Sequence, residues 1–303
     1  MSQEYKSINV VLYGYKDKNV FNTIKNLLDN KSGKHFIFVH LQEQHPLDRS
    51  KQFADLINSY EGNNGAYVHI FWDLINGTVE PKDIRLKATI GGRYHLSMYS
   101  GVQLEKNWDD KLINFVDNNR AIVSGNKQVK IGNKNLFYID KQYSDISDFE
   151  VTNFVDRNFI FGEVKLMKTS LLGTYMYPAY LKYYGEEETL SLQYFKDRIP
   201  VYAAPESIVK IDRYNTIEDF DVYVPFSLNH NYNEVISLFK NGRNNFANVD
   251  MNIIKEFNKF HNFDFSSLEY LPFPTNDVEY DMRSSGFDRL DGSRFVKQLK
   301  KID

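Results

Sequence analysis

The chain has 303 residues, enough for one large α/β domain with an addition or for two domains. Its hydrophobic content of 42% supports a packed core, and its formal net charge of −3 gives no overall basic field of the kind that marks nucleic-acid-binding proteins. The absence of cysteine excludes disulfides and thiolate metal sites. No signal-peptide pattern or membrane-length apolar run is present, so we expect a cytoplasmic protein without a membrane partner, in the host cytoplasm if a phage encodes it.

The amino-terminal residues predict a β-α-β unit. Residues 8–13 (INVVLY) have the composition of a buried strand, and Asn19 can cap a helix that follows it. Residues 36–41 (FIFVHL) predict a second strand. This order favours a right-handed crossover between parallel strands. The apolar residues of the helix are Val20, Ile24, Leu27 and Leu28.

Polar and aromatic residues lie where these two strands end. Because ligands of parallel sheets bind beyond the carboxyl ends of the strands, such residues are candidate ligand contacts. Each of them could also be an ordinary polar loop residue. They are Tyr13, Tyr15, Lys16 and Asp17 at the end of the first strand, and Gln42 and Gln44 at the end of the second.

Strand and helix patterns continue to alternate along the chain. A short basic tail (Arg294, Lys297, Lys300) is expected to be a solvated helix face. Strands are predicted over residues 66–72, 120–124, 136–139 and within 154–161, and helices over 109–118, 233–239 and 252–260.

Three consecutive carboxylates, Glu186, Glu187 and Glu188, open a predicted helix. Pro200 ends this helix, and residues 201–211 are predicted to form a strand. The helix dipole stabilises an acidic cluster at this position, which requires no function. Alternatively, one of the carboxylates faces a cleft and contacts a polar substrate. The helix is expected to have one apolar side, made of Leu190, Leu192, Tyr194 and Phe195.

Gly185-Glu186-Glu187, the helix after it and the segment Tyr202…Pro205…Val209 resemble the second half of the GlcNAc-transferase family that modifies hydroxyproline in a cytoplasmic protein. The resemblance implies a GT-A fold, a Rossmann-like α/β fold with a mixed, mostly parallel sheet flanked by helices. We expect this domain to cover residues 1–225, with a donor half to about residue 110 and an acceptor half over 111–225. Residues 226–303 are expected to form a helical or irregular extension packed on it.

The expected donor half contains further pieces of the family pattern. Tyr15-Lys16-Asp17 is similar to a Tyr-Arg-Asp sequence that ends a strand in the family, and the next strand ends in a Gln-rich loop. The resemblance implies that Tyr15 and Asp17 lie near the uridine of a UDP-sugar. Residues 88–93 (ATIGGR) resemble a third family segment, in which Arg93 could bind the diphosphate bidentately unless it is a surface or sheet-edge arginine.

The stretch that resembles the family's metal motif departs from it. Ser100 matches the family, but Tyr99 stands where the family has aspartate and Gly101 where it has histidine. Neither tyrosine nor glycine is a usual ligand of Mn²⁺ or Mg²⁺. Asp212 stands where the family tends to have a metal-binding histidine and is the one remaining candidate ligand. We therefore expect an incomplete metal site.

Two explanations of this departure stay open. In the first, the chain has become a catalytically inactive nucleotide-sugar-binding module. Alternatively it works without a metal, and a positive side chain neutralises the leaving diphosphate. The retained Gly185-Glu186-Glu187 sequence favours the enzyme. The candidate cations are Lys16, Arg93, Lys210 and Arg213.

The resemblance also implies an acceptor side. Glu186 or Glu187 would orient the acceptor hydroxyl or the sugar, and could act as a base if the reaction inverts configuration. Trp108 is either a core residue or a support for the motif before it. The acceptor-side residues implied in this way are Trp108, Tyr184, Gly185 and Arg213.

The expected function is transfer of a hexose or pentose from a UDP-linked donor to a hydroxyl of a macromolecule. The family resemblance implies a protein hydroxyl. The 21 Tyr and 23 Phe are typical of an A/T-rich genome, such as that of a protist, a low-GC bacterium or a phage. A phage origin would suggest instead that glucose or arabinose is added to 5-hydroxymethylcytosine in DNA. For such a phage-type enzyme we expect DNA binding that weakens steeply as the salt concentration rises.

Overall fold

The computed structural model of the chain describes two compact units. Unit 1 is assembled from Met1–Asn126, Glu150–Met176 and Ile199–Arg213, and unit 2 from Lys127–Phe149, Tyr177–Arg198 and Tyr214–Asp303. Both units take residues from the expected acceptor half. The residues described are 6–15, 19–44, 50–60, 65–72, 92–125, 129–131, 134–136, 155–156, 164–174, 186–211, 236–243, 249–261, 266, 268–270 and 297–299.

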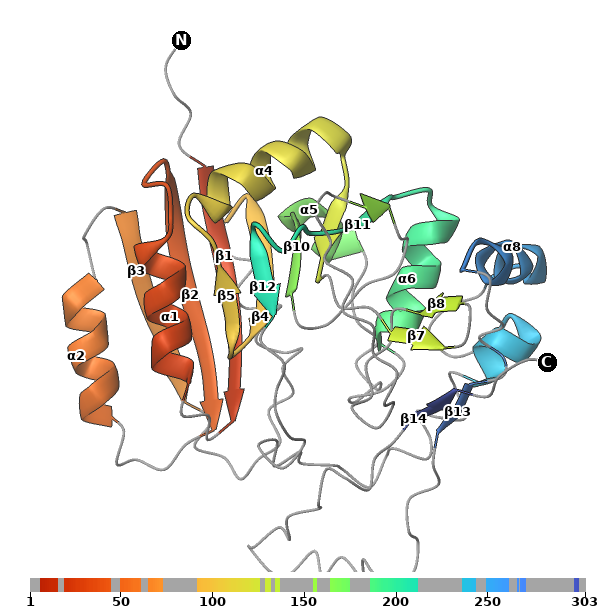
Figure 1. Cartoon of the computed structure of the whole chain (residues 1–303), viewed down its shortest axis with the longest axis horizontal. Coiled ribbons are helices and arrows are strands. Elements are labelled where there is room, and N and C mark those ends of the chain that lie inside the picture. The colour runs from red at the N-terminus through yellow and green to blue at the C-terminus, as the bar shows by residue number, and fades with distance from the viewer. Residues whose placement is uncertain are drawn as a thin grey trace, which may run out of the picture. The chain divides into compact units, whose positions relative to one another are not determined.

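Unit 1 is built on an eight-stranded sheet with the strand order β3-β2-β1-β4-β10-β6-β11-β9 (Figure 1). β1, β2, β3 and β4 are parallel, whereas β10 runs antiparallel to both of its neighbours. The predicted mixed, mostly parallel α/β sheet is therefore confirmed. The strands are β1 (Lys6–Tyr15), β2 (His35–Gln44), β3 (Ala66–Trp72), β4 (Tyr94–Tyr99), β6 (Ile122–Ser124), β9 (Val155–Asp156), β10 (Val164–Lys168) and β11 (Val201–Ala203).

Helix α1 (Val20–Asp29) connects β1 to β2 and completes the predicted β-α-β unit. Its four predicted apolar residues are all buried. Asn19 precedes the helix, but its side chain makes no cap hydrogen bond, so that part of the prediction is wrong. Its backbone carbonyl accepts hydrogen bonds from the amide and the hydroxyl of Thr23 instead. The other described helices of unit 1 are α2 (Ser50–Tyr60), α4 (Trp108–Asn119) and α5 (Thr169–Thr174).

The register gives the sheet two chemically different faces. Residues paired across parallel or antiparallel strands lie on the same face, and successive residues alternate. Ile8, Val10 and Leu12 of β1 pair with apolar residues of β2 and β4, and they join α1 and α4 in one hydrophobic core. The opposite face carries buried polar residues, which we call the polar face: Asn9, His95, Ser97, Ser124 and Lys165.

The segment predicted as one strand over residues 201–211 forms two strands in different sheets. β11 belongs to the large sheet, whereas β12 (Val209–Ile211) pairs with β5 (Val102–Leu104) in a two-stranded ribbon. Pro205 lies between them, and its carbonyl accepts hydrogen bonds from the amides of Ile208 and Val209. This turn separates the two strands, which the apolar pattern alone does not indicate.

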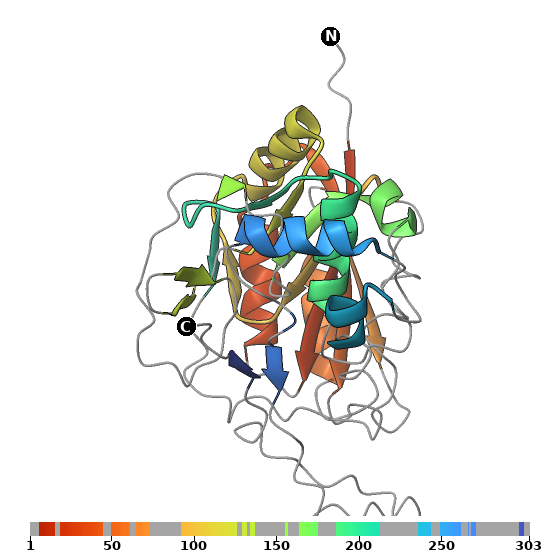
Figure 2. The ribbon, with the colours of Figure 1, turned by 90° about the vertical axis from the view of Figure 1, so that its right-hand side faces the viewer.

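Unit 2 contains α6 (Glu186–Lys196) and α8 (Met251–His261), which confirm two predicted helices. α8 packs across α6, with the rings of Phe195 and Phe257 in edge contact at 5.3 Å (Figure 2). α6 is not one-sided as predicted, because residues 189–192 are all buried. A further helical segment covers residues 236–241.

The described strands of unit 2 form two short antiparallel pairs. β7 (Val129–Ile131) pairs with β8 (Lys134–Leu136), and β13 (Leu268–Tyr270) pairs with β14 (Lys297–Leu299). The basic tail expected to be helical thus forms a strand over Lys297–Leu299, where a cross-strand partner is available. Among the described residues, no helix has both the length and the apolar character needed to cross a membrane.

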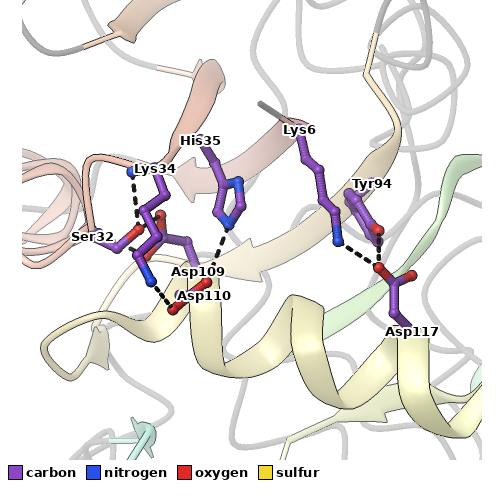
Figure 3. Close-up of polar contacts among 8 residues, drawn as sticks. All are labelled: Lys6, Ser32, Lys34, His35, Tyr94, Asp109, Asp110 and Asp117. Carbon is purple, nitrogen blue, oxygen red and sulfur yellow. Dashed lines mark hydrogen bonds and ion pairs between the residues drawn. The ribbon is translucent and has the colours of Figure 1, made fainter. Parts of the chain in front are cut away.

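Helix α4 closes the amino edge of the sheet, the edge at which β1, β2 and β4 begin (Figures 1 and 3). At its first turn, the buried carboxylate of Asp109 accepts hydrogen bonds from the amide and hydroxyl of Ser32 at 2.7 and 2.8 Å. The neighbouring Asp110 pairs with Lys34 at 2.7 Å and lies 3.6 Å from the imidazole of His35. The pKa of His35 is lowered, chiefly by burial and further by the charge of Lys6, although both carboxylates raise it.

The last turn of α4 is held by Asp117. Its carboxylate accepts hydrogen bonds from Lys6 at 2.6 Å and from the Tyr94 hydroxyl at 2.7 Å, and it pairs with Lys168 at 2.9 Å. These residues begin β1, begin β4 and end the antiparallel β10, so one side chain joins three strands. Burial alone would raise the pKa of Asp117, but the three donors outweigh it and hold the pKa well below its usual range.

We expect Asp117→Asn to lower the free energy of unfolding by about 1–3 kcal/mol, because charged hydrogen bonds are lost at a partly buried site. Since the pKa of Asp117 is lower in the folded than in the unfolded protein, its contribution is present above about pH 4 and is lost as the pH falls below that value. Urea denaturation at pH 7 and pH 3 measures both effects. The matched control is Asp55→Asn, which removes an exposed carboxylate on α2. Equal stability of Asp117→Asn and the wild type at pH 7 would contradict the assignment.

Candidate functional site

Because α4 occupies the amino edge, the carboxyl edge of the parallel strands is the edge left for ligand contacts. There β1, β2 and β4 end together: Tyr13 is in register with Gln42 on one side and with Tyr99 on the other, and Tyr15 with Gln44. The structure thus brings four sequence-predicted positions, Tyr13, Tyr15, Gln42 and Tyr99, to one sheet edge. Ligands of open α/β sheets bind at this edge.

A tight turn follows β4 at this edge and leads into β5. Gly101 in the turn has φ +89°, a left-handed conformation that favours glycine over a side-chain-bearing residue. Its amide donates to the Thr23 hydroxyl at 2.8 Å, and the hydroxyl of the buried Ser100 lies 3.5 Å from the same atom. The turn is therefore fixed to the first part of α1 by a hydroxyl on the helix. A histidine in place of Gly101 would be strained.

The residues of this turn do not fit a divalent cation. Gly101 offers no side chain, and the Ser100 hydroxyl is directed to Thr23 on α1. Hard divalent cations prefer several carboxylate or carbonyl oxygens in one place. Within the described ranges, no group of three or more His, Asp or Glu side chains lies close enough to hold a metal ion. Asp212, the remaining candidate ligand, lies outside the described residues.

Arg93 is not placed with the other candidate residues. It directly precedes β4, and its amide donates to the carbonyl of Ser7 near the start of β1. Arg93 therefore lies at the amino edge, and β4 separates it from Tyr99 by about 20 Å along the strand. The grouping of Arg93 with the carboxyl-edge residues is corrected by the parallel register of β1 and β4.

Trp108 belongs to the core of unit 1. It is 0% exposed, and its indole N–H donates to the carbonyl of Leu27 at 2.9 Å. It is the first residue of α4 and belongs to the hydrophobic core that this helix forms with α1 and the strands. A direct acceptor contact is therefore excluded in this conformation, and the core interpretation holds. The adjacent Asp109 is likewise engaged, with Ser32.

Several other sequence-predicted residues lie outside the described residues. These are Lys16, Asp17, Tyr184, Gly185 and Arg213. Glu186 and Glu187 are the first two residues of α6 in unit 2. Their position at a helix start fits a stabilising role with the helix dipole, and it is also compatible with a functional role.

The polar face is the feature that sequence analysis missed. Five polar side chains there are each less than 5% exposed, and Lys165 is among the largest fully buried side chains. The signal was present in the alternation of β4 (YHLSMY) and β10 (VKLMK), where a histidine, a serine and a lysine interrupt apolar runs. The members of the set are Asn9, His95, Ser97, Ser124 and Lys165.

No protein-family model matches the chain, and no curated protein matches it in sequence. Solved GT-A glycosyltransferases are similar in structure. GalNAc-T7 with UDP, GalNAc and Mn²⁺ superposes with a TM-score of 0.55 at 14% identity, over 86% of this chain and 55% of that chain. S. aureus TarS 1–349 superposes with a TM-score of 0.51 at 14% identity, over 84% of this chain and 71% of that chain. The chain thus spans about half the length of GalNAc-T7, and the likeness shows a GT-A fold.

The hydroxyl that fixes the turn after β4 can be tested directly. Thr23→Val keeps the shape of the side chain but leaves the Gly101 amide without its acceptor, so we expect a loss of about 1–2 kcal/mol in the free energy of unfolding. Thr23→Ser retains the hydroxyl and serves as the matched control. Urea denaturation of both variants measures the difference. Unchanged stability of Thr23→Val together with a loss in Thr23→Ser would show that the methyl group, and not the hydroxyl, supports the turn.

Proposed function

We propose that the chain is a glycosyltransferase that moves a sugar from a nucleotide-sugar, UDP-linked, to a hydroxyl of a larger acceptor. The observation that carries the proposal is the GT-A sheet, which this chain shares with GalNAc-T7 and TarS. The structure of GalNAc-T7 contains UDP. In this chain the carboxyl edge of the same type of sheet is formed by the ends of β1, β2 and β4.

The carboxyl edge supplies the proposed donor contacts. Tyr13, Tyr15, Gln42 and Tyr99 end three neighbouring strands there, and Lys16 and Asp17 follow Tyr15 in sequence. By the family resemblance, Tyr15 and Asp17 lie near the uridine. Ser100 and Gly101 contribute the shape of the turn beside this edge, since their polar groups are directed to α1.

The donor's diphosphate needs positive charge as it leaves. GalNAc-T7 was solved with Mn²⁺, but the turn after β4 in this chain does not fit a cation. We therefore assign charge neutralisation to side chains. Lys210 on the β5–β12 ribbon is exposed and available, and Lys16 and Arg213 are further candidates. Arg93 is set aside because it lies at the amino edge.

The acceptor side of the proposal rests on the family resemblance. Glu186 or Glu187 at the start of α6 would orient the acceptor hydroxyl, with Tyr184 and Gly185 directly before them in sequence. Arg213 is the further acceptor-side residue implied by the resemblance. If the glutamate acts as a base, it takes the hydroxyl proton while the acceptor oxygen bonds to the sugar C1. The bond from C1 to the diphosphate oxygen breaks, and UDP leaves.

The resemblance favours a hydroxyproline-type protein hydroxyl as acceptor and GlcNAc as the sugar. Hydroxymethylated DNA is the second acceptor to test, because it offers the same nucleophile, a primary or secondary hydroxyl, on another macromolecule. The proposed catalytic domain covers residues 1–225, with 226–303 as an extension.

The test is a panel of UDP-sugars assayed for hydrolysis and transfer, with hydroxyproline peptides and hydroxymethylated DNA as acceptors, in Mn²⁺ and in chelator. We expect turnover with one UDP-sugar that persists in chelator. Turnover only with Mn²⁺ would contradict side-chain neutralisation. Nucleotide binding without turnover on any donor would identify a binding module and overturn the enzymatic proposal.

Glu186→Gln or Glu187→Gln is expected to lower kcat by about 10²-fold or more while UDP affinity is retained, because the carboxylate acts on the acceptor and not on the nucleotide. Glu188→Gln, which alters the next carboxylate of the same run, is the matched control and should keep most of the activity. Steady-state kinetics and calorimetric UDP titration measure the two effects. Similar activity in all three variants would remove these residues from the mechanism.

A further inference from the structure

Phe260, near the end of α8 in unit 2, carries an exposed aromatic ring. Among the described residues two large apolar side chains are exposed, and Phe260 is the more exposed of them, at 50%. A single exposed ring requires no function. This ring, however, lies 5.8 Å from that of Phe195 on α6, which meets the buried ring of Phe257 edge-on at 5.3 Å. Phe260 is therefore the outer member of an aromatic cluster formed where α8 crosses α6 (Figure 2).

Arg198 links the two helices beside this cluster. It follows the end of α6 with φ +57°, and its guanidinium lies 5.5 Å from the centre of the Phe195 ring. A cation over an aromatic ring is a favourable contact. The same guanidinium pairs with Glu256 of α8 at 3.2 Å. The part of α8 that carries Phe260 is thus held against α6 by ring contacts and by an ion pair.

The exposed residues at the end of α6 and along α8 carry more positive than negative charge. Lys255 and Lys259 are exposed and one turn apart, so they lie on one side of α8. Four cations and two carboxylates are exposed here, in a chain whose net charge is −3. We call this set the basic aromatic surface, and its members are Lys196, Asp197, Arg198, Lys255, Glu256, Lys259 and Phe260.

An exposed aromatic ring together with cations fits single-stranded nucleic acid. Every base has a flat face that can stack on a phenyl ring, and the phosphates of the strand bind lysine and arginine. An acidic peptide would require the cations alone. The combination of ring and cations therefore favours unpaired nucleotides over an acidic peptide.

Helix α6 connects this surface to the proposed acceptor side. Glu186 begins the helix and Lys196 ends it, ten residues later. At a rise of 1.5 Å per residue, these positions are about 15 Å apart along the helix axis. A stacked strand of about four nucleotides covers that length. A strand whose phosphates are bound at the end of α6 can therefore reach the first turn of the same helix with another of its nucleotides.

We infer that the basic aromatic surface binds single-stranded DNA, with a base stacked on Phe260 and phosphates at Lys255 and Lys259. This inference rests on the proposed function, and it selects hydroxymethylated DNA as the acceptor class. The surface holds the strand and takes no part in the transfer of the sugar. Its contribution is therefore measured by DNA binding, without a sugar donor.

The ring is tested with a fluorescent single strand of about 12 nucleotides that contains 5-hydroxymethylcytosine, bound to the full chain and followed by anisotropy. We expect Phe260→Leu, which keeps an apolar side chain but has no flat face, to raise the Kd of the strand about tenfold. Phe260→Tyr keeps the ring and should bind the strand like the wild type. The UDP affinity, measured by calorimetry, should be unchanged in both variants.

The cations are tested by the salt dependence of the same binding. Lys255→Met/Lys259→Met should lower the slope of log Kd against log salt concentration by about 1.4, because two phosphate contacts are lost. The charge-matched control is Lys51→Met/Lys111→Met, which removes two exposed lysines of unit 1 and should leave the slope unchanged. Since Lys255 and Lys259 are exposed, this pair tests the surface even if Phe260→Leu does not fold.

Three results would overturn the inference. These are wild-type DNA affinity in a folded Phe260→Leu variant, an equal change of slope in the two lysine pairs, and binding of an acidic or hydroxyproline peptide without binding of the strand. Sugar transfer to a peptide by a chain that does not bind the strand also overturns the inference and leaves the proposed function standing. Binding of the strand through this surface without transfer to any acceptor overturns the proposed function instead.

Discussion

The parallel register of β1 with β2 and β4 is the constraint on which unit 1 depends. Ile8, Val10 and Leu12 face one way and meet apolar partners on both neighbouring strands. A slip of one residue would turn these side chains to the polar face and bring Asn9 into the core. The same register brings the ends of the three strands together. Core formation and site formation are therefore consequences of one pairing.

Helix α4 makes the two edges of this sheet different. Its carboxylates bind groups at the starts of three parallel strands: Asp109 and Asp110 at β2, and Asp117 at β1 and β4. Lys6, Lys34 and Lys168 at the amino edge are paired with these carboxylates. These three lysines therefore do not attract an anion to that edge. The opposite edge, where β1, β2 and β4 end, is the edge proposed to contact the ligand. The two ends of the sheet differ in that α4 covers the amino edge.

The alternation of apolar residues made the β-α-β unit, the strand at 66–72, α4 and α8 predictable, since each buries a periodic face. The division of residues 201–211 between two sheets was not predictable. The turn at Pro205 is made by backbone hydrogen bonds, which leave no periodic pattern in the sequence. Local composition likewise did not indicate at which edge of the sheet Arg93 lies. Its position depends on whether β4 is parallel to β1, which is a property of the tertiary fold.

The polar face was also not predictable from local sequence. A lysine in the pattern VKLMK is ordinarily expected on a solvated sheet face, and only the covering of that face in the folded unit makes it buried. For the candidate site, sequence identified the strand-end residues because strand ends follow from periodicity. It did not identify Thr23, whose hydroxyl fixes the Gly101 turn from a helix 78 positions away in sequence.

The partner of β4 on its outer side is β10, whose residues lie more than sixty positions later in the chain. A ribosome that has produced the first four parallel strands has therefore made a sheet whose β4 edge still offers unpaired amides and carbonyls. Until Val164–Lys168 emerges, this edge can pair with another nascent chain. The order of synthesis thus exposes the growing protein to edge-to-edge association, and any fragment that stops before Lys168 retains that hazard permanently.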